Sequence, residues 1–365
     1  MTSNLSQFIK FLKEEISENQ ISSANTIDVI DPRDRLENKS EICVKPKNTQ
    51  EISKILKLAN KFIIPIIPIG GSTGLVGGQI ASQSNHVTLS LEKLDTINFF
   101  KDSNLLYVQS GAILSNIKKL AFNNGRLFPL SLASEGSCQI GGNLATNAGG
   151  LNVIKYGNVR DLCLGLEAVL PCGQIVSTMK PLKKNNMGFD LKNLLIGSEG
   201  TLGIITSTIL KTFPIPKDPV SIFLSINNLA DVLFVFEKIS REFSERILAF
   251  ELIKMTGIDF IEETGFTIKN PFNKKTNWKV LIEIDVNIGP SNLGEIIENT
   301  FYDLLLENKI VEVFFATNIN QRNEFWKIRE LIPAANRKKG SICSNDISVP
   351  IEKIPEFIKK LDNSI

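Results

Sequence analysis

Two glycine-rich runs, each following an apolar segment, constrain this chain more than any other feature of its sequence. The first is Gly70-Gly71-Ser72-Thr73-Gly74-Leu75-Val76-Gly77-Gly78, and the second spans residues 136–150 and contains Gly141-Gly142-Asn143. Glycine permits positive φ and close approach of the backbone, so such runs can turn several N–H groups toward an anion, to which Ser and Thr hydroxyls add donors. The runs therefore predict a site for a phosphate or pyrophosphate group.

The common nucleotide-binding motifs do not account for these runs. No Lys-Ser/Thr pair follows the first run as a P-loop requires, and neither run has the Gly-x-Gly-x-x-Gly spacing of a dinucleotide fold. A third run, Gly197-Ser198-Glu199-Gly200-Thr201-Leu202-Gly203, has the wrong spacing too. A single glycine-rich loop is more often a plain turn, but three of them, dense in Ser, Thr and Asn, favour one ligand cleft.

The amino-acid composition limits the classes of protein to which this chain can belong. A chain of 365 residues with 42% apolar residues suggests two domains, and a net charge of +2 with interspersed signs argues against a nucleic-acid partner. The five cysteines form no Cys-x-x-Cys pair, which argues against a disulfide scaffold, a zinc ribbon or an iron–sulfur cluster and favours a reducing compartment. With no signal-peptide core and no apolar run long enough to span a bilayer, we expect a cytoplasmic location, with peripheral association at the inner membrane left open.

Hydrophobic periodicity predicts an α+β chain. Residues 1–20 have the pattern of an amphipathic helix, residues 49–61 and 113–123 also have helical spacing, and residues 43–46, 86–91, 105–110, 161–170 and 203–212 are strand candidates. The proline-rich stretch 213–219 suits an extended linker, and beyond it strand-like and helix-like patterns alternate. We therefore expect a helical leader over residues 1–37, a first domain over 38–216 and a second over 217–365, with a sheet flanked by helices.

The three runs, together with Tyr156-Gly157-Asn158-Val159-Arg160-Asp161 and Gly188-Phe189-Asp190-Leu191, resemble the vanillyl-alcohol-oxidase superfamily of PCMH-type flavoproteins. Within it the chain is most similar to the D-2-hydroxyglutarate and D-lactate dehydrogenases and the glycolate oxidase D subunit. The resemblance implies a two-lobed FAD-binding domain followed by a partial α/β sandwich substrate domain. It assigns the cofactor site to Gly70, Gly71, Ser72, Thr73, Gly74, Leu75, Ser137, Gly141, Gly142, Asn143, Thr146, Glu199, Gly200 and Ile204.

His86 is the single histidine of the chain and lies outside the glycine-rich runs. We expect it to have a surface or structural role. Some relatives attach FAD through a histidine in the cofactor loops, so the resemblance implies that FAD is non-covalent here.

The segment Phe325-Trp326-Lys327-Ile328-Arg329-Glu330, continuing to Asn345-Asp346-Ile347-Ser348-Val349-Pro350, resembles the substrate-domain signature of the 2-hydroxyacid enzymes. Arg329 matches the arginine that holds a substrate carboxylate, a role suited to the guanidinium fork. The alternative for Arg329 is a surface salt bridge to a neighbouring glutamate. Glu330 and Asp346 are not assigned as bases.

Two departures from the family bear on catalysis. Ser344 stands where relatives often carry a lysine facing the substrate, so either the preferred acid differs or the site is impaired. Relatives also continue into a histidine-rich segment that ligates zinc and supplies the catalytic base, whereas this sequence ends at Ile365. We therefore expect the catalytic base and the zinc ligands to lie outside this chain, with no metal residues within it.

The resemblance implies oxidation of a small D-2-hydroxy acid to the 2-oxo acid, with hydride transfer to FAD and electrons leaving to an external acceptor. Two alternatives stay open: a truncated or split FAD-binding subunit that needs a complementing C-terminal chain, and a glycolate oxidase subunit. A homodimer is also compatible with the sequence.

Overall fold

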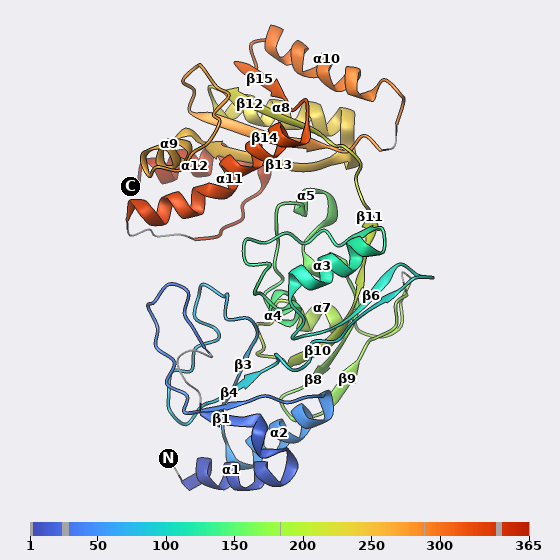
Figure 1. Cartoon of the computed structure of the whole chain (residues 1–365), viewed down its shortest axis with the longest axis vertical. Helices are drawn as coiled ribbons and strands as arrows, with labels where there is room; N and C mark the ends of the chain where they lie inside the picture. The colour runs from blue at the N-terminus through green and yellow to red at the C-terminus, as the bar shows by residue number, and fades with distance from the viewer. Residues whose placement is uncertain (1–2, 24–28, 183, 288, 341–344, 365) are drawn as a thin grey trace. The chain divides into compact units, whose positions relative to one another are not determined.

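Among the described residues, the first unit of the chain, Met1–Ile215, contains two larger sheets and one two-stranded sheet, and the second unit is Pro216–Ile365 (Figure 1). The computed structural model describes residues 3–23, 29–182, 184–287, 289–340 and 345–364. Each unit has its own hydrophobic cores, as the alternation of helical and strand patterns predicts. Helices and strands mix in both units, which agrees with the α+β prediction.

The first sheet of unit 1 has the strand order β1-β2-β4-β3, formed by Ile21–Ser23, Ile42–Val44, Val87–Ser90 and Ile66–Ile69. Strands β2 and β3 both pair with β4 in parallel, and β1 pairs with β2 antiparallel. Helices α1 (Ser3–Glu15) and α2 (Thr49–Phe62) pack their apolar faces on this sheet, so the residues predicted as a leader contribute to its core. Helix α2 begins at Asn48, whose side chain accepts a hydrogen bond from the Glu51 N–H.

The second sheet of unit 1 is antiparallel, with the order β5-β6-β10-β8-β9. Its strands are Ile97–Phe100, Leu105–Gln109, Ile204–Lys211, Cys163–Val169 and Ile175–Ser177. The helices α3 to α7 span Leu114–Asn123, Ile140–Ala145, Val153–Tyr156, Val159–Leu162 and Leu191–Leu195. Strands β7 (Arg126–Leu127) and β11 (Phe213–Pro214) form a short ladder, so part of the predicted linker pairs with the first unit.

The two sheets of unit 1 are joined where the strands of the second sheet meet helix α2. Val169 at the end of β8 and Ile204 at the start of β10 belong to the core of the first sheet. Thr49 Oγ1 donates to Glu167 Oε1 at 2.7 Å, and Ser53 Oγ donates to the Gly173 carbonyl at 2.5 Å. These contacts hold α2 of the first sheet against β8 and the turn that follows it in the second sheet.

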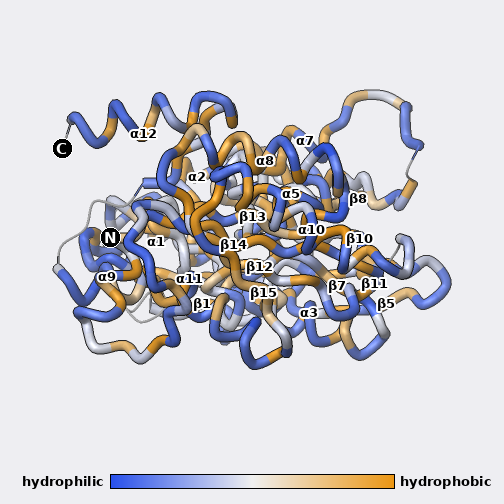
Figure 2. Tube along the Cα trace, turned by 90° about the horizontal axis from the view of Figure 1, so that it is seen from above, coloured by the Kyte–Doolittle hydropathy of each residue, from blue (hydrophilic) through white to orange (hydrophobic). Residues whose placement is uncertain are grey.

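In unit 2, strands and helices alternate as β12-α8-β13-α9-β14-α10-β15-α11, and the strands form one antiparallel sheet with the order β13-β14-β12-β15. The strands are Ile247–Lys254, Trp278–Ile284, Val220–Ile226 and Glu312–Phe315. Helices α8 (Leu229–Phe243) and α10 (Leu293–Leu306) pack on one core, and α9 (Met255–Glu263) and α11 (Ile319–Lys339) on the other. Helix α12 spans Ile354–Asp362. The tube in Figure 2 shows long hydrophobic stretches along β12 and β14, the strands buried between the two layers.

In the part of the chain that the structure describes, short 3-10 helices η1, η2 and η3 lie at Glu18–Gln20, Ser244–Arg246 and Ile351–Lys353. No helix within the described residues has the length and apolar character needed to cross a membrane.

Candidate functional site

One cavity of unit 1, of about 270 Å³, brings the three glycine-rich runs together. It is lined by parts of residues 68–79, 132–148 and 199–205. The predicted cofactor residues in its lining are Gly70, Gly71, Ser72, Thr73, Gly74, Gly141, Gly142, Asn143, Thr146, Glu199, Gly200 and Ile204. Segments far apart in the sequence thus form one concave surface, as expected for a ligand site.

Close backbone contact explains why the first run is glycine where it meets the second. A Cβ atom built on Gly71 would lie 2.0 Å from the Ser137 carbonyl oxygen, which leaves no room for any side chain. A Cβ atom on Gly141 would likewise lie 2.5 Å from Cβ of Ser110. The glycines at these positions allow the loops and β6 to approach to backbone contact.

The third run is held against the end of α4 by backbone hydrogen bonds. The Gly197 N–H donates to the Leu144 carbonyl at 3.0 Å, and the Glu199 N–H donates to the Ala145 carbonyl at 2.8 Å. Gly200 has a φ of 79° and lies against Pro68 of β3, where a Cβ would be 2.8 Å from Cγ of the proline. The third run therefore forms part of the cavity wall, between α4 and the end of β3.

Several polar atoms in the cavity wall have no partner among the described residues. Ser72 Oγ, Gln139 Oε1 and Asn143 Oδ1 are buried, and each belongs to a residue that lines the cavity. Buried polar atoms are normally hydrogen-bonded, so these three point to a polar ligand. Ser72 also has a φ of 51°, a left-handed conformation that is uncommon for non-glycine residues.

These features fit FAD. The hydroxyl of Ser72 and the amide oxygens of Gln139 and Asn143 provide both donor and acceptor capacity, which a diphosphate flanked by hydroxylated ribose and ribityl groups requires. A Cβ built on Gly142 meets no atom within 4 Å, so this glycine leaves space open at the cavity wall.

Two predicted cofactor residues do not line the cavity, and Gln139 was not predicted. Leu75 is 43% exposed, and its carbonyl accepts a hydrogen bond from Arg35 Nη2 at 2.7 Å. Ser137 touches Gly71 through its carbonyl, with its side chain directed to the Ser134 carbonyl. Gln139 lies inside the second glycine-rich run, but its amide could be singled out only once its burial was known.

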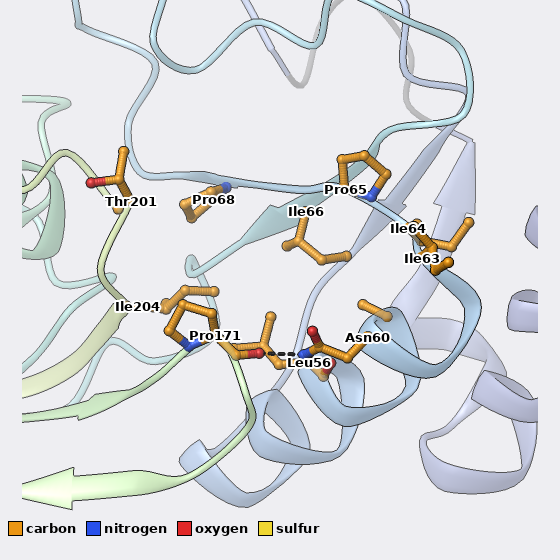
Figure 3. A pocket seen from close by; sticks show the side chains of 13 residues that line it. Leu56, Asn60, Ile63, Ile64, Pro65, Ile66, Pro68, Pro171, Thr201 and Ile204 are labelled. Atoms are coloured by element: carbon orange, nitrogen blue, oxygen red, sulfur yellow. Dashed lines mark hydrogen bonds between the residues drawn. The ribbon is translucent and has the colours of Figure 1, made fainter.

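A larger cavity of about 660 Å³ adjoins the first and shares Pro68, Gly200, Gly203 and Ile204 with it. Figure 3 shows Ile66 and Pro68 of β3 facing Leu56 and Asn60 of α2 across this space. The Asn60 side chain donates to the Pro171 carbonyl and the Leu56 carbonyl, so the main polar group of the wall is already satisfied. The larger cavity is therefore suited to an apolar or flat aromatic group.

In unit 2, Arg329 on α11 donates from Nε to Glu251 Oε2 of β13 at 2.7 Å. Its side chain is 33% exposed, and its terminal nitrogens bond no other described residue. The ion pair considered for Arg329 thus exists, but it joins the helix to a strand and not to a neighbour on the same helix. The prediction about Ser344 concerns a position outside the described residues.

A second arginine of α11, Arg322, binds a buried carboxylate through two of its nitrogens. Its Nε and Nη2 donate to the two carboxylate oxygens of Glu283 at 2.6 and 3.0 Å, and Trp326 Nε1 and Ser221 Oγ also donate to Oε1 at 2.7 Å each. Glu283 is buried on β14, so this network anchors α11 on the sheet. Arg329 differs from Arg322 in that only its Nε is engaged by a carboxylate of the described residues.

Among the described residues, side chains that could bind a metal ion or undergo redox chemistry do not cluster in one place. Within the described residues no group of three or more His, Cys, Asp or Glu side chains could hold a metal ion. Cys43, Cys138 and Cys163 are buried and Cys172 is exposed, all as free thiols, and burial raises the pKa of the Cys163 thiol. His86 is partly buried just before β4 and does not line either cavity.

Comparison with known families identifies both halves of the chain. Residues 40–179 match the family described as FAD binding domain, and residues 215–365 match the family described as FAD linked oxidases, C-terminal domain. Among curated proteins, the chain is 32% identical over 364 residues to the mitochondrial D-2-hydroxyglutarate dehydrogenase of Arabidopsis thaliana, covering 98% of this chain and 64% of the relative. It is 34% identical over 334 residues to a putative mitochondrial D-lactate dehydrogenase of Schizosaccharomyces pombe, covering 90% of this chain and 62% of the relative. The chain thus spans less than two thirds of the length of these relatives.

Solved structures share the fold at lower identity. Alkyldihydroxyacetonephosphate synthase superposes with a TM-score of 0.73 at 19% identity, covering 98% of this chain and 74% of that one. p-Cresol methylhydroxylase superposes with a TM-score of 0.70 at 14% identity, and the alignment covers 91% of this chain and 70% of that one. These neighbours confirm the predicted PCMH-type fold.

The predicted cytoplasmic location is contradicted by the curated relatives, whose names place them in mitochondria. The prediction rested on free cysteines and the lack of a secretory signal, and these features report a reducing compartment without distinguishing the cytoplasm from the mitochondrial matrix. The matches to the two families agree with the interpretation of the three glycine-rich runs and with the substrate-domain resemblance of the segment that begins at Phe325. The chain therefore belongs to the FAD-linked oxidases, in which an FAD binding domain precedes this C-terminal domain, and is a homologue of the D-2-hydroxyglutarate and D-lactate dehydrogenases.

Proposed function

We propose that this chain binds FAD non-covalently in the cavity of unit 1 and oxidises a small D-2-hydroxy acid to the corresponding 2-oxo acid. The observation that supports this most strongly is the convergence of three glycine-rich runs on one cavity whose wall contains unpartnered buried polar atoms. Bound FAD would supply the two-electron acceptor for this oxidation.

The residues of unit 1 would hold the cofactor mainly by hydrogen bonds. Ser72 and Thr73 would donate to the diphosphate beside the N–H groups of the first run, whereas Asn143 and Gln139 would accept from hydroxyl or ring N–H groups. The described lining includes no His, Cys or Tyr that could form a covalent bond to the flavin, which supports non-covalent binding. The adjoining apolar cavity would take the flat adenine end of the dinucleotide.

Arg329 would bind the substrate carboxylate through its terminal nitrogens while Nε stays on Glu251. We divide the roles as the sequence suggested: residues 38–216 hold the cofactor and 217–365 the substrate. The relatives named as dehydrogenases of D-2-hydroxyglutarate and D-lactate support a substrate of this class.

Further parts of the proposal concern groups outside the described site. An external acceptor would reoxidise the enzyme, and a complementing chain and a homodimer are both compatible with it. Zinc does not fit the residues present, since no converging group of ligands exists among those described, so we assign no metal ligand to this chain.

Acid precipitation of the purified protein tests the cofactor assignment, because non-covalent FAD is released as yellow flavin into the supernatant. A colourless protein that also fails to bind added FAD would overturn it. Anaerobic mixing with D-2-hydroxyglutarate, D-lactate or glycolate, with or without a separately expressed C-terminal fragment, tests the reaction by bleaching of flavin absorbance. The L-enantiomers of 2-hydroxyglutarate and lactate serve as controls. FAD binding without bleaching under any condition would leave a cofactor-binding role and contradict the oxidation.

A further inference from the structure

The segment of residues 30–39, which we call the strap, is hydrogen-bonded to the first glycine-rich run and to the residues that follow it. The Lys39 N–H donates to the Ala81 carbonyl at 2.9 Å, and the Ala81 N–H donates to Asn38 Oδ1 at 3.0 Å. At the other end, Gln79 Nε2 donates to the Ile30 carbonyl at 3.3 Å and to the Gly74 carbonyl at 2.8 Å. Hydrogen bonds thus hold both ends of the strap to the run and to the residues that follow it.

The strap is organised around one buried carboxylate. Asp31 is 4% exposed and accepts the backbone N–H groups of Arg35, Leu36 and Arg33 at 2.9, 3.0 and 3.2 Å. Burial opposes ionisation of Asp31, but these backbone donors together with the Arg35 charge outweigh it, so the pKa of Asp31 is held below its ordinary value. Asp31 therefore stays charged and fixes the turn that carries Arg35.

Arg35 links this turn directly to the run. Its Nη2 donates to the Leu75 carbonyl at 2.7 Å, across 40 positions of sequence, and its Nε lies 3.9 Å from Asp31 Oδ2. Leu75 stands between Gly74 and Val76, both of which line the cavity. Next to this bond, Leu36 covers Gly77, where a Cβ would lie 2.3 Å from Cδ1 of the leucine.

The arrangement places a fixed positive charge beside the loop expected to receive a diphosphate. Bonds from Arg35 and Gln79 engage the Leu75 and Gly74 carbonyls of the run. Peptide groups oriented in this way leave the loop pre-arranged before a ligand arrives, which lowers the entropic cost of binding. The strap also precedes residue 40, where the match to the FAD binding domain begins.

We propose that Arg35 is a positioning residue for the diphosphate of the cofactor, acting through the Leu75 carbonyl and through its charge, with Asp31 holding it in place. The proposal rests on the proposed binding of FAD in this cavity.

The test measures dissociation constants of the apoprotein for FAD, ADP and riboflavin, by flavin fluorescence and by ADP competition, at several salt concentrations. Arg35→Ala should weaken FAD and ADP about tenfold, the size expected for one charge-assisted hydrogen bond that is partly exposed. Riboflavin, which lacks phosphate, should bind as to the wild type. The salt dependence of FAD binding should decrease, because a charge near the diphosphate is lost.

Matched variants separate positioning from a general loss of structure. Arg35→Lys should recover most of the affinity, and Asp31→Asn should weaken FAD in the same direction as Arg35→Ala. Lys39→Ala removes an exposed positive charge of the strap whose side chain bonds no described residue, so FAD affinity should stay unchanged.

FAD affinity of Arg35→Ala within twofold of wild type would overturn the proposal, as would equal losses for FAD and riboflavin. A wild-type apoprotein that binds no FAD would instead overturn the proposed function itself. The thermal unfolding midpoint of each apoprotein identifies a variant that fails to fold, and we expect Arg35→Ala to keep the wild-type midpoint. If Arg35→Ala does not fold, the FAD affinities of Arg35→Lys and Asp31→Asn test the proposal instead.

Discussion

Arg329 Nε and Glu251 Oε2 lie 2.7 Å apart, in an ion pair that joins helix α11 to strand β13. The bond uses one donor of the guanidinium and orients the rest of the group. A carboxylate that approaches Arg329 must share it with Glu251, so the affinity for an anionic substrate depends on both residues.

Replacing Arg329 with lysine should weaken the binding of 2-oxo acids about tenfold, because a point charge replaces a planar fork with two parallel donors. Titration of the FAD-loaded protein with 2-oxoglutarate, followed through the flavin spectrum, measures this. Binding equal to that of the wild type would show that Arg329 serves only the ion pair with Glu251.

Replacing Glu251 with glutamine should strengthen 2-oxo acid binding a few-fold, since a neutral amide competes less well for the guanidinium than a carboxylate does. The same titration applies. Weaker binding by this variant would mean that the charge of Glu251 is needed to hold Arg329 in its binding conformation.

Replacing Gly142 with alanine should stabilise the apoprotein by about 0.5–1 kcal/mol, since Gly142 lies within α4 and a Cβ there meets no atom within 4 Å. The new methyl group would at the same time enter the space left at the cavity wall and lower FAD affinity. Urea unfolding and FAD titration measure the two effects. Stabilisation with unchanged FAD affinity would exclude Gly142 from the cofactor site.

Replacing Arg322 with methionine should destabilise the protein by about 2 kcal/mol, because the buried carboxylate of Glu283 loses its bidentate partner. The partial exposure of Arg322 reduces the cost below that of a fully buried pair. Urea unfolding is the measurement, and Lys327→Met, an exposed change on the same helix, is the control. Equal stability of the two variants would contradict an anchoring role for the network.

Burial of Lys279 leads to a prediction about how the stability of the protein depends on pH. Lys279 is fully buried on β14, and burial lowers the pKa of its ammonium group despite the opposing effects of Glu312 and Asp259. The unfolded chain therefore binds more protons than the folded one between the lowered pKa and about 10.4, so stability due to this group rises as the pH rises through that window. Lys279→Met should remove this rise in urea unfolding measured from about pH 7 to the unfolded pKa of lysine. An unchanged pH dependence would show that Lys279 does not cause it.

The sequence predicted the local features well where a single segment determines the structure. Helix α2 and strand β6 occupy the residues that periodicity indicated, and the glycine-rich runs meet at one cavity. Helix α9 was not predicted, because Met255–Glu263 is short and contains Gly257, which has a poor helix propensity.

Contacts between distant segments could not be predicted in this way. The polar segment around Asp31 has no periodicity that links it to the first run, and its carboxylate becomes informative only once it is seen to be buried. The pairing of Arg329 with Glu251 likewise depends on how α11 packs on the sheet, which sequence spacing alone does not determine.

The backbone contact between Gly71 and Ser137 has a consequence for the order of folding. Such a contact closes a long stretch of chain that contains the β5–β6 pair, so its loop-closure entropy exceeds that of the β5–β6 hairpin. The cavity should therefore be completed late, and a ligand that binds only the completed cavity stabilises the whole unit by mass action. The amount of cofactor available during synthesis would then determine what fraction of the newly made chain is folded.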